Sequence, residues 1–112
     1  MADMTPLHLA VELEDLPRLR DLLDAGGDIH DEDDYGFTLL HHAIDVEIDG
    51  HTQTGEPLEV STTAYLLARG ADPLRRPEGG RGVTAEHMAF VCGHWLATAL
   101  FEVWRETHPD RT

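Results

Sequence analysis

A repeated pattern of threonine and histidine constrains the fold of this chain more than any other sequence feature. The same Thr-x-x-His block opens three segments: residues 5–10 (TPLHLA), 38–43 (TLLHHA) and 84–89 (TAEHMA). The first two threonines are 33 residues apart, and the third follows after 46, which is 33 plus an insertion of 13. Self-similarity at such a period indicates stacked supersecondary units, none of which can bury its apolar face alone.

A second element recurs downstream of the first two blocks and locates most of the insertion. It reads LLDAGGD at residues 22–28 and LLARGAD at residues 66–72. Sixteen residues separate Ala10 from Gly26, but 27 separate Ala43 from Gly70. Eleven of the extra residues therefore lie inside the second unit, at about 46–56, and the other two precede Thr84.

The local chemistry of each unit favours two helices followed by a turn. Thr5 suits a helix N-cap because Pro6 follows at the first helical position, where its missing N–H costs nothing. Asp15 suits the N-cap of a second helix that presents leucines on one face. Gly26 and Gly70 stand where the end of a helix favours a left-handed residue.

The pattern resembles the ankyrin repeat, whose 33-residue unit opens on Thr-Pro-Leu-His and closes on Leu-Leu-x-x-Gly-Ala-Asp. The resemblance implies an all-α fold, a solenoid of three stacked helix-turn-helix units with short β-turn or hairpin connections. It implies one domain over residues 1–112, with repeats at about 4–36, 37–82 and 83–108.

By the same resemblance, the motif histidines His8, His41 and His87 are structural and form hydrogen bonds within and between repeats. His94 matches the Gly-His position of the family, at the start of an outer helix, and is expected to be structural too.

The insertion at about 46–56 departs most from the family pattern. Apolar and polar residues alternate from Val46 to the Asp49-Gly50 step, a pattern typical of a small hairpin. Pro57 suits the first turn of the helix that would follow. A loop on a rigid scaffold often carries function, and a tolerated surface insertion is the alternative.

The residues that could support metal binding or catalysis do not form a recognised motif. The nearest approach to a metal site pairs two histidines with two aspartates, His42, Asp45, Asp49 and His51. The acidic run at residues 28–34 lacks the pattern of a calcium loop. Cys92 is expected to be a buried or half-buried structural thiol, and Ser61 has no nucleophile setting. We therefore expect no metal, no cofactor and no enzymatic activity.

In ankyrin-like stacks the partner meets the turn tips and the exposed face of the inner helices. Carrying these positions over one by one predicts a partner-binding surface. Its residues are Glu12, Leu13, Glu32, Asp34, Tyr35, Phe37, Asp45, Val46, Arg76, Arg81, Val83 and Val91.

The net charge of −14 belongs entirely to the first half of the chain. Residues 1–60 carry sixteen acidic and two basic residues, whereas residues 61–112 carry six of each. Such a field repels nucleic acid and anionic lipid and accelerates encounter with a cationic partner, although an acidic surface can also serve solubility alone.

These features predict a non-catalytic module that binds one protein partner with a basic surface and is a monomer when free. It would act as an acidic adaptor or inhibitor, for example a bacterial antidote or immunity protein that blocks a toxin. A regulatory or assembly subunit that docks on a larger enzyme or signalling complex is the alternative.

The chain contains neither Lys nor Asn. Both residues use A-rich codons, so their absence indicates a GC-rich genome, and a bacterial source is expected. A single cysteine, the lack of a long apolar run and an N-terminus without signal-peptide character predict a cytoplasmic location.

Overall fold

Threonine caps begin the inner helix of each repeat, as the sequence pattern predicts. The computed structural model describes residues 4–111. The inner helices α1 (Pro6–Glu12), α3 (Leu39–Thr54) and α6 (Ala85–Cys92) follow Thr5, Thr38 and Thr84. The hydroxyl of each threonine accepts a hydrogen bond from the backbone N–H three residues later, which satisfies a donor that the helix itself leaves free.

An outer helix follows each inner helix and runs back alongside it. These outer helices are α2 (Leu16–Asp24), α4 (Ser61–Ala68) and α7 (Trp95–Thr107), and a 3₁₀ turn (Pro109–Arg111) follows α7. The predicted cap Asp15 accepts a hydrogen bond from the Arg18 N–H at 3.2 Å. The predicted glycines Gly26 and Gly70 have φ values of 105° and 101°, the left-handed region that glycine adopts without strain.

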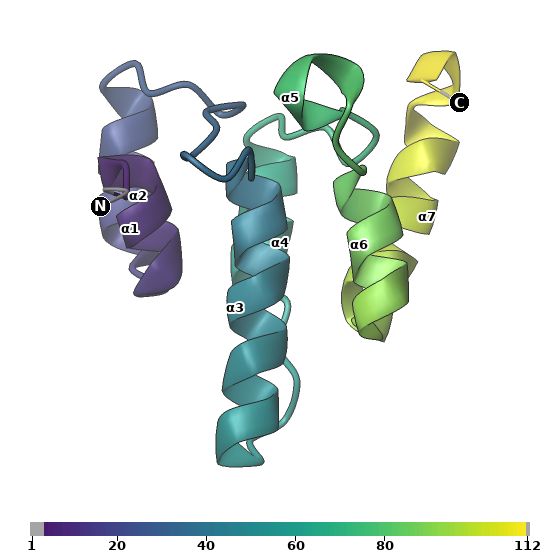
Figure 1. The fold of residues 1–112 in the computed structure, drawn as a ribbon, viewed down its shortest axis with the longest axis horizontal. Coiled ribbons are helices and arrows are strands. Elements are labelled where there is room, and N and C mark those ends of the chain that lie inside the picture. The colour runs from purple at the N-terminus through teal and green to yellow at the C-terminus, as the bar shows by residue number, and fades with distance from the viewer. Residues whose placement is uncertain (1–3, 112) are drawn as a thin grey trace.

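The three helix pairs stand side by side, with α1, α3 and α6 in a row and the connecting turns at one end (Figure 1). The expected all-α solenoid of stacked helix pairs is therefore confirmed. An isolated antiparallel bridge between Glu32 and Thr38 closes the first turn. The second connection begins with a turn in which the Arg75 N–H donates to the Asp72 carbonyl at 3.2 Å. It also contains a one-turn helix that the sequence pattern does not predict, α5 (Pro77–Gly80).

One apolar core runs through the stack between neighbouring pairs. Leu19 from repeat 1, Leu39 and Ile44 from α3, Leu66 from α4 and Phe101 from α7 are all fully buried. These side chains belong to one buried cluster drawn from all three helix pairs, and neighbouring pairs contact each other through α1 with α3, α3 with α6 and α4 with α7. Such contacts are expected of repeats that are stabilised by their neighbours. Among residues 4–111, no helix has the length and apolar character needed to cross a membrane.

The insertion extends α3 and does not form the hairpin that the sequence pattern predicts. α3 continues through the Asp49-Gly50 step to Thr54 and ends at Gly55, which has a φ of 73°. The second half of α3 projects beyond the ends of the neighbouring inner helices (Figure 1). Lengthening an existing helix requires no new nucleus, whereas an isolated two-stranded hairpin is only marginally stable in water.

Two further expectations about local structure are wrong. The helix after the insertion begins at Ser61 and not near Pro57, because residues 55–60 are needed as an extended return alongside the longer α3. Cys92 is exposed, because it is the last residue of α6 and lies at the outer end of the described stack.

Candidate protein-binding surface

The motif histidines are committed to holding the stack together. The Nε2 of His8 lies 2.8 Å from the carbonyl oxygen of Phe37, and that of His41 lies 2.7 Å from the carbonyl oxygen of Val83. Since a carbonyl only accepts, Nε2 donates in both cases, and the Nδ1 of each neutral ring accepts from its capping threonine hydroxyl. Burial lowers the pKa of His41, which favours this neutral form. Their predicted structural role is therefore confirmed.

The third motif histidine has the same backbone position but a different environment. The backbone N–H of His87 donates to the Thr84 hydroxyl at 3.0 Å, as in the other two repeats. Its side chain is exposed. In repeats 1 and 2 the carbonyl that accepts from the ring lies in the turn that follows the repeat, and within residues 4–111 no such turn follows repeat 3. The predicted hydrogen bond between repeats is thus absent at this position.

The predicted binding residues of the first turn form an exposed aromatic tip. Tyr35 is 72% exposed, and the Phe37 ring stacks on His41 with centroids 5.9 Å apart. Asp34 is exposed beside them, and Glu32 is partly buried. A Glu32 carboxylate oxygen accepts a hydrogen bond from the Glu78 N–H at 3.1 Å, so the first turn touches the second.

The second turn brings Arg76, Arg81 and Val83 to the surface next to the first turn. All three are exposed. Both arginines also hold the turn in place: Arg76 donates to the Gly82 carbonyl at 3.4 Å, and Arg81 donates to the Glu78 carbonyl at 3.2 Å. These guanidinium groups therefore support the turn that presents them, in addition to being available at the surface.

The predicted binding residues of the inner helices lie one helix length away from the turns. Leu13 and Val91 are exposed where α1 and α6 end, and Asp45 is exposed in the middle of α3. Glu12 on α1 lies 3.2 Å from Nε2 of the buried His42 on α3, without hydrogen-bond geometry, while Val46 is half-buried. The predicted positions thus form two groups. One lies at the two turns and is called the turn cluster: Glu32, Asp34, Tyr35, Phe37, Arg76, Arg81 and Val83. The other lies along the inner helices.

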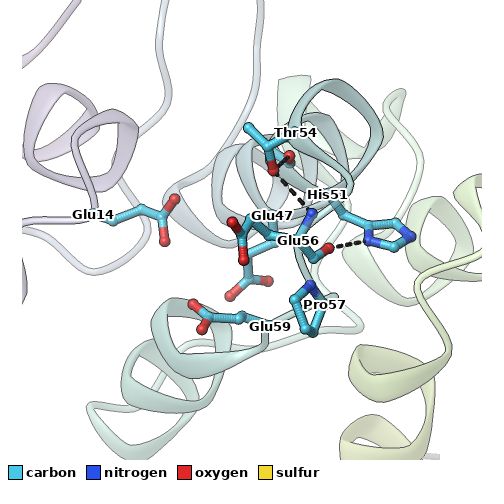
Figure 2. Close-up of a pocket in the computed structure, with 8 residues that line it drawn as sticks. Glu14, Glu47, His51, Thr54, Glu56, Pro57 and Glu59 are labelled. Atoms are coloured by element: carbon cyan, nitrogen blue, oxygen red, sulfur yellow. Dashed lines mark hydrogen bonds between the residues drawn. The ribbon is translucent and has the colours of Figure 1, made fainter.

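An acidic hollow that was not predicted opens at the ends of the helices opposite the connecting turns, beside the extension of α3. Its volume is about 290 Å³. Glu14 from the α1–α2 turn, Glu47 from α3 and Glu59 from the return segment approach it from three sides (Figure 2). Burial, together with the negative charges of Glu47 and Glu59, raises the pKa of Glu14.

Glu47 is the fixed wall of this hollow because its carboxylate is held by three hydrogen bonds. Oε1 accepts from the Thr63 hydroxyl at 2.6 Å and from Nε2 of His94 at 2.9 Å, and Oε2 accepts from the Thr63 N–H at 3.2 Å. The side chain is 1% exposed, so these partners replace the water that the carboxylate loses on burial. His94 also caps α7, which confirms its predicted structural role.

The four residues considered for a metal site do not converge. All of them lie on α3, and nine residues of α-helix turn His51 about 180° away from His42. Nδ1 of His51 lies 2.6 Å from the Glu56 carbonyl oxygen, and Asp49 accepts from Gln53. Within the described part of the chain, no group of three or more histidine, cysteine or acidic side chains is arranged to hold a metal ion.

Stacked helix pairs joined by threonine–histidine–carbonyl contacts define a helical-repeat solenoid. Residues 3–34 match the family model of the ankyrin repeat. Repeat 1 is therefore similar to an ankyrin repeat, and the all-helical stack of the whole chain is consistent with an ankyrin-repeat protein. A comparison with curated proteins found no match. Ankyrin repeats are protein–protein interaction modules, so the family supports a non-catalytic binding role for this chain.

Sequence reasoning missed the acidic hollow and one aromatic pair. Glu14 and Glu59 are distant in the sequence, and a hairpin at residues 46–51 would have placed Glu47 elsewhere. Phe90 and Trp95 are exposed at the end of the stack. A signal for Phe90 does exist, because it occupies the repeat position of the buried residues Val11 and Ile44 and yet is exposed in the described stack.

Proposed function

We propose that this ankyrin-repeat protein is an acidic adaptor or inhibitor that captures one protein partner with a basic surface. In its most concrete form it is a bacterial immunity protein that binds a toxin in the cytoplasm and blocks the positive face with which the toxin meets its substrate. In this proposal the free protein is a monomer at the concentrations at which it meets its partner, and neither nucleic acid nor membrane is a ligand.

The uneven charge is the observation that carries this proposal. The net charge of −14 lies within residues 1–60, on the helix pairs that supply the first turn and the acidic hollow. A field of one sign over part of a small scaffold steers an oppositely charged protein toward that part. A partner with a basic surface therefore meets repeats 1 and 2 first.

The acidic hollow supports the same partner chemistry at short range. Burial raises the pKa of Glu14, and the negative charges of Glu47 and Glu59 add to this by opposing its ionisation. A lysine or arginine side chain entering the hollow would relieve that opposition and lower the pKa of Glu14 again. Binding would then release a proton in the pH range where Glu14 is partly protonated in the free protein.

The turn cluster supplies the apolar anchor that a charge field lacks. Tyr35 and Phe37 stand out from the first turn beside Asp34. Interface hot spots favour aromatic residues and arginine surrounded by polar groups. An arginine of the partner could stack on Tyr35 while its charge meets Asp34.

Capture from a lysate of the source organism identifies the partner, with Tyr35→Ala and Arg76→Ala as surface variants. The association rate of the purified pair is then measured between about 0.05 and 0.5 M salt. A steep fall with salt supports the proposal, and Glu59→Gln should reduce the rate. The matched control, Glu106→Gln, removes an exposed charge from the neutral half and should leave the rate unchanged.

The immunity form of the proposal adds a stricter requirement. A partner encoded beside this chain should be toxic when expressed alone and harmless when the two are expressed together. An association rate that does not change with salt removes the electrostatic part of the proposal. A non-toxic partner removes the immunity part and leaves the binding role intact.

A further inference from the structure

The end of the stack formed by α6 and α7 differs from the internal repeats at the positions that face the next repeat. In repeat 1 these positions are apolar and buried: Leu7, Val11, Leu19 and Leu23. Counting from the helix caps, the equivalent residues of repeat 3 are Glu86, Phe90, Thr98 and Glu102. Together with Trp95, we call this surface the C-terminal face.

Three polar replacements make the C-terminal face unsuitable for another repeat of the same kind. Glu86 accepts hydrogen bonds from the Arg105 guanidinium, one of them at 2.6 Å, and this pairing lowers the pKa of Glu86. Stacking a leucine-rich helix pair here would bury Glu86, Thr98 and Glu102 against apolar side chains, which is strongly unfavourable. The face therefore suits a different occupant.

Two aromatic side chains remain uncovered on this polar face. Phe90 is 73% exposed, whereas its equivalents Val11 and Ile44 are 0% exposed. Trp95 is 67% exposed. They border a groove of about 330 Å³ that also contains the small residues Ala89, Gly93 and Ala99. One surface thus carries both protruding aromatic groups and a hollow lined by small residues.

We propose that a second copy of this chain docks on the C-terminal face, with the two faces related by a twofold axis. A twofold contact requires a self-complementary surface, and the aromatic groups and the groove of the same face meet that requirement. Charge selects this pairing as well. It brings together the two neutral halves and places both acidic halves at the far ends. Contact through repeat 1 would instead bring the ten acidic and two basic residues of segment 4–36, a net charge of −8, to the interface from each copy.

The size of the face predicts a weak dimer. Helices of 8 and 13 residues are about 12 and 20 Å long, so the contact buries on the order of 800 Å² in total. Stable dimers bury about 1,200–2,000 Å² or more. We therefore expect a dissociation constant on the order of 100 μM, which leaves the chain monomeric at low concentration.

Sedimentation velocity from about 1 to 500 μM, under reducing conditions because Cys92 is exposed, tests the proposal. The weight-average mass should rise from 12.5 kDa toward twice that value. Phe90→Ala and Trp95→Ala should each weaken association about tenfold, as loss of a central aromatic anchor does. Both side chains are exposed, so the variants keep their helical circular dichroism.

A fluorescence measurement locates the contact independently. In a Trp104→Phe background Trp95 is the only tryptophan, and its emission should shift to the red as the protein is diluted. Leu13→Ser changes an equally exposed apolar residue on the opposite end of the stack and should leave association unchanged. A monomer at 500 μM, or a dimer lost in Leu13→Ser and kept in Trp95→Ala, would overturn the proposal. Because no partner protein is present, these outcomes are separate from the proposed function.

Discussion

Oε1 of Glu47 lies 2.9 Å from Nε2 of His94, 47 residues later in the sequence, and this contact joins the long inner helix of repeat 2 to the outer helix of repeat 3. Both side chains are almost completely buried. The contact links neighbouring repeats through side chains that the repeat pattern alone does not pair, and several expectations about stability follow from it and from the motif histidines.

Removing the Glu47 carboxylate should strongly destabilise the protein. Glu47→Ala leaves a buried ring nitrogen of His94 and two donors of Thr63 without partners, at a cost of about 3 kcal/mol in the free energy of unfolding. Glu47→Gln keeps some of the hydrogen bonds and should cost about 1–2 kcal/mol. Urea unfolding measures both, and the exposed Glu106→Gln should stay close to zero. Equal values for Glu47→Ala and Glu106→Gln would contradict the network.

The motif histidines should differ in their contribution to stability, although their motif is the same. His41→Ala removes a partly buried hydrogen bond between repeats and a buried one to Thr38, and should cost about 2–3 kcal/mol. His87→Ala removes an exposed ring and should change stability by less than about 0.5 kcal/mol. Thermal and urea unfolding of the two variants provide the comparison, and a large loss for His87→Ala would indicate a contact beyond the described stack.

Acidification should reveal the buried state of His41. Its pKa is lowered in the folded chain by burial, so the unfolded chain binds more protons at this residue. Its contribution is fully present above the unfolded pKa of about 6.5 and is lost as the pH falls below it. Unfolding free energies of the wild type and His41→Gln should therefore converge on acidification through this range. A constant difference would show that the ring titrates normally.

Two glycine substitutions distinguish the continuous helix from a hairpin. Gly50 lies within α3, and a Cβ there would have no atom within 4 Å, so Gly50→Ala should stabilise the protein by about 0.5–1 kcal/mol. Gly55 ends the helix with a φ of 73°, so Gly55→Ala should destabilise it by about 1 kcal/mol. A hairpin turn at Asp49-Gly50 would require a positive φ at Gly50 and would reverse the first result.

Local signals in the sequence were sufficient for most of the fold. The threonine caps, Asp15 and the left-handed glycines each determine a helix end through contacts within a few residues. The alternation around Asp49-Gly50 was misleading because the burial of Glu47, which fixes the outcome, depends on Thr63 and His94. The acidic hollow could not be predicted for the same reason, since Glu14, Glu47 and Glu59 meet only after the longer α3 and its return have formed.

The projecting half of α3 has a consequence for the exchange of its amide hydrogens with solvent. From Gly50 to Thr54 the helix extends past the stack, so it can unwind one turn at a time from its free end. At Glu47 the fraying stops, because that side chain is anchored to two other helices. Amides beyond this point should exchange by local opening at a rate independent of global stability, and those before it only when the whole chain unfolds.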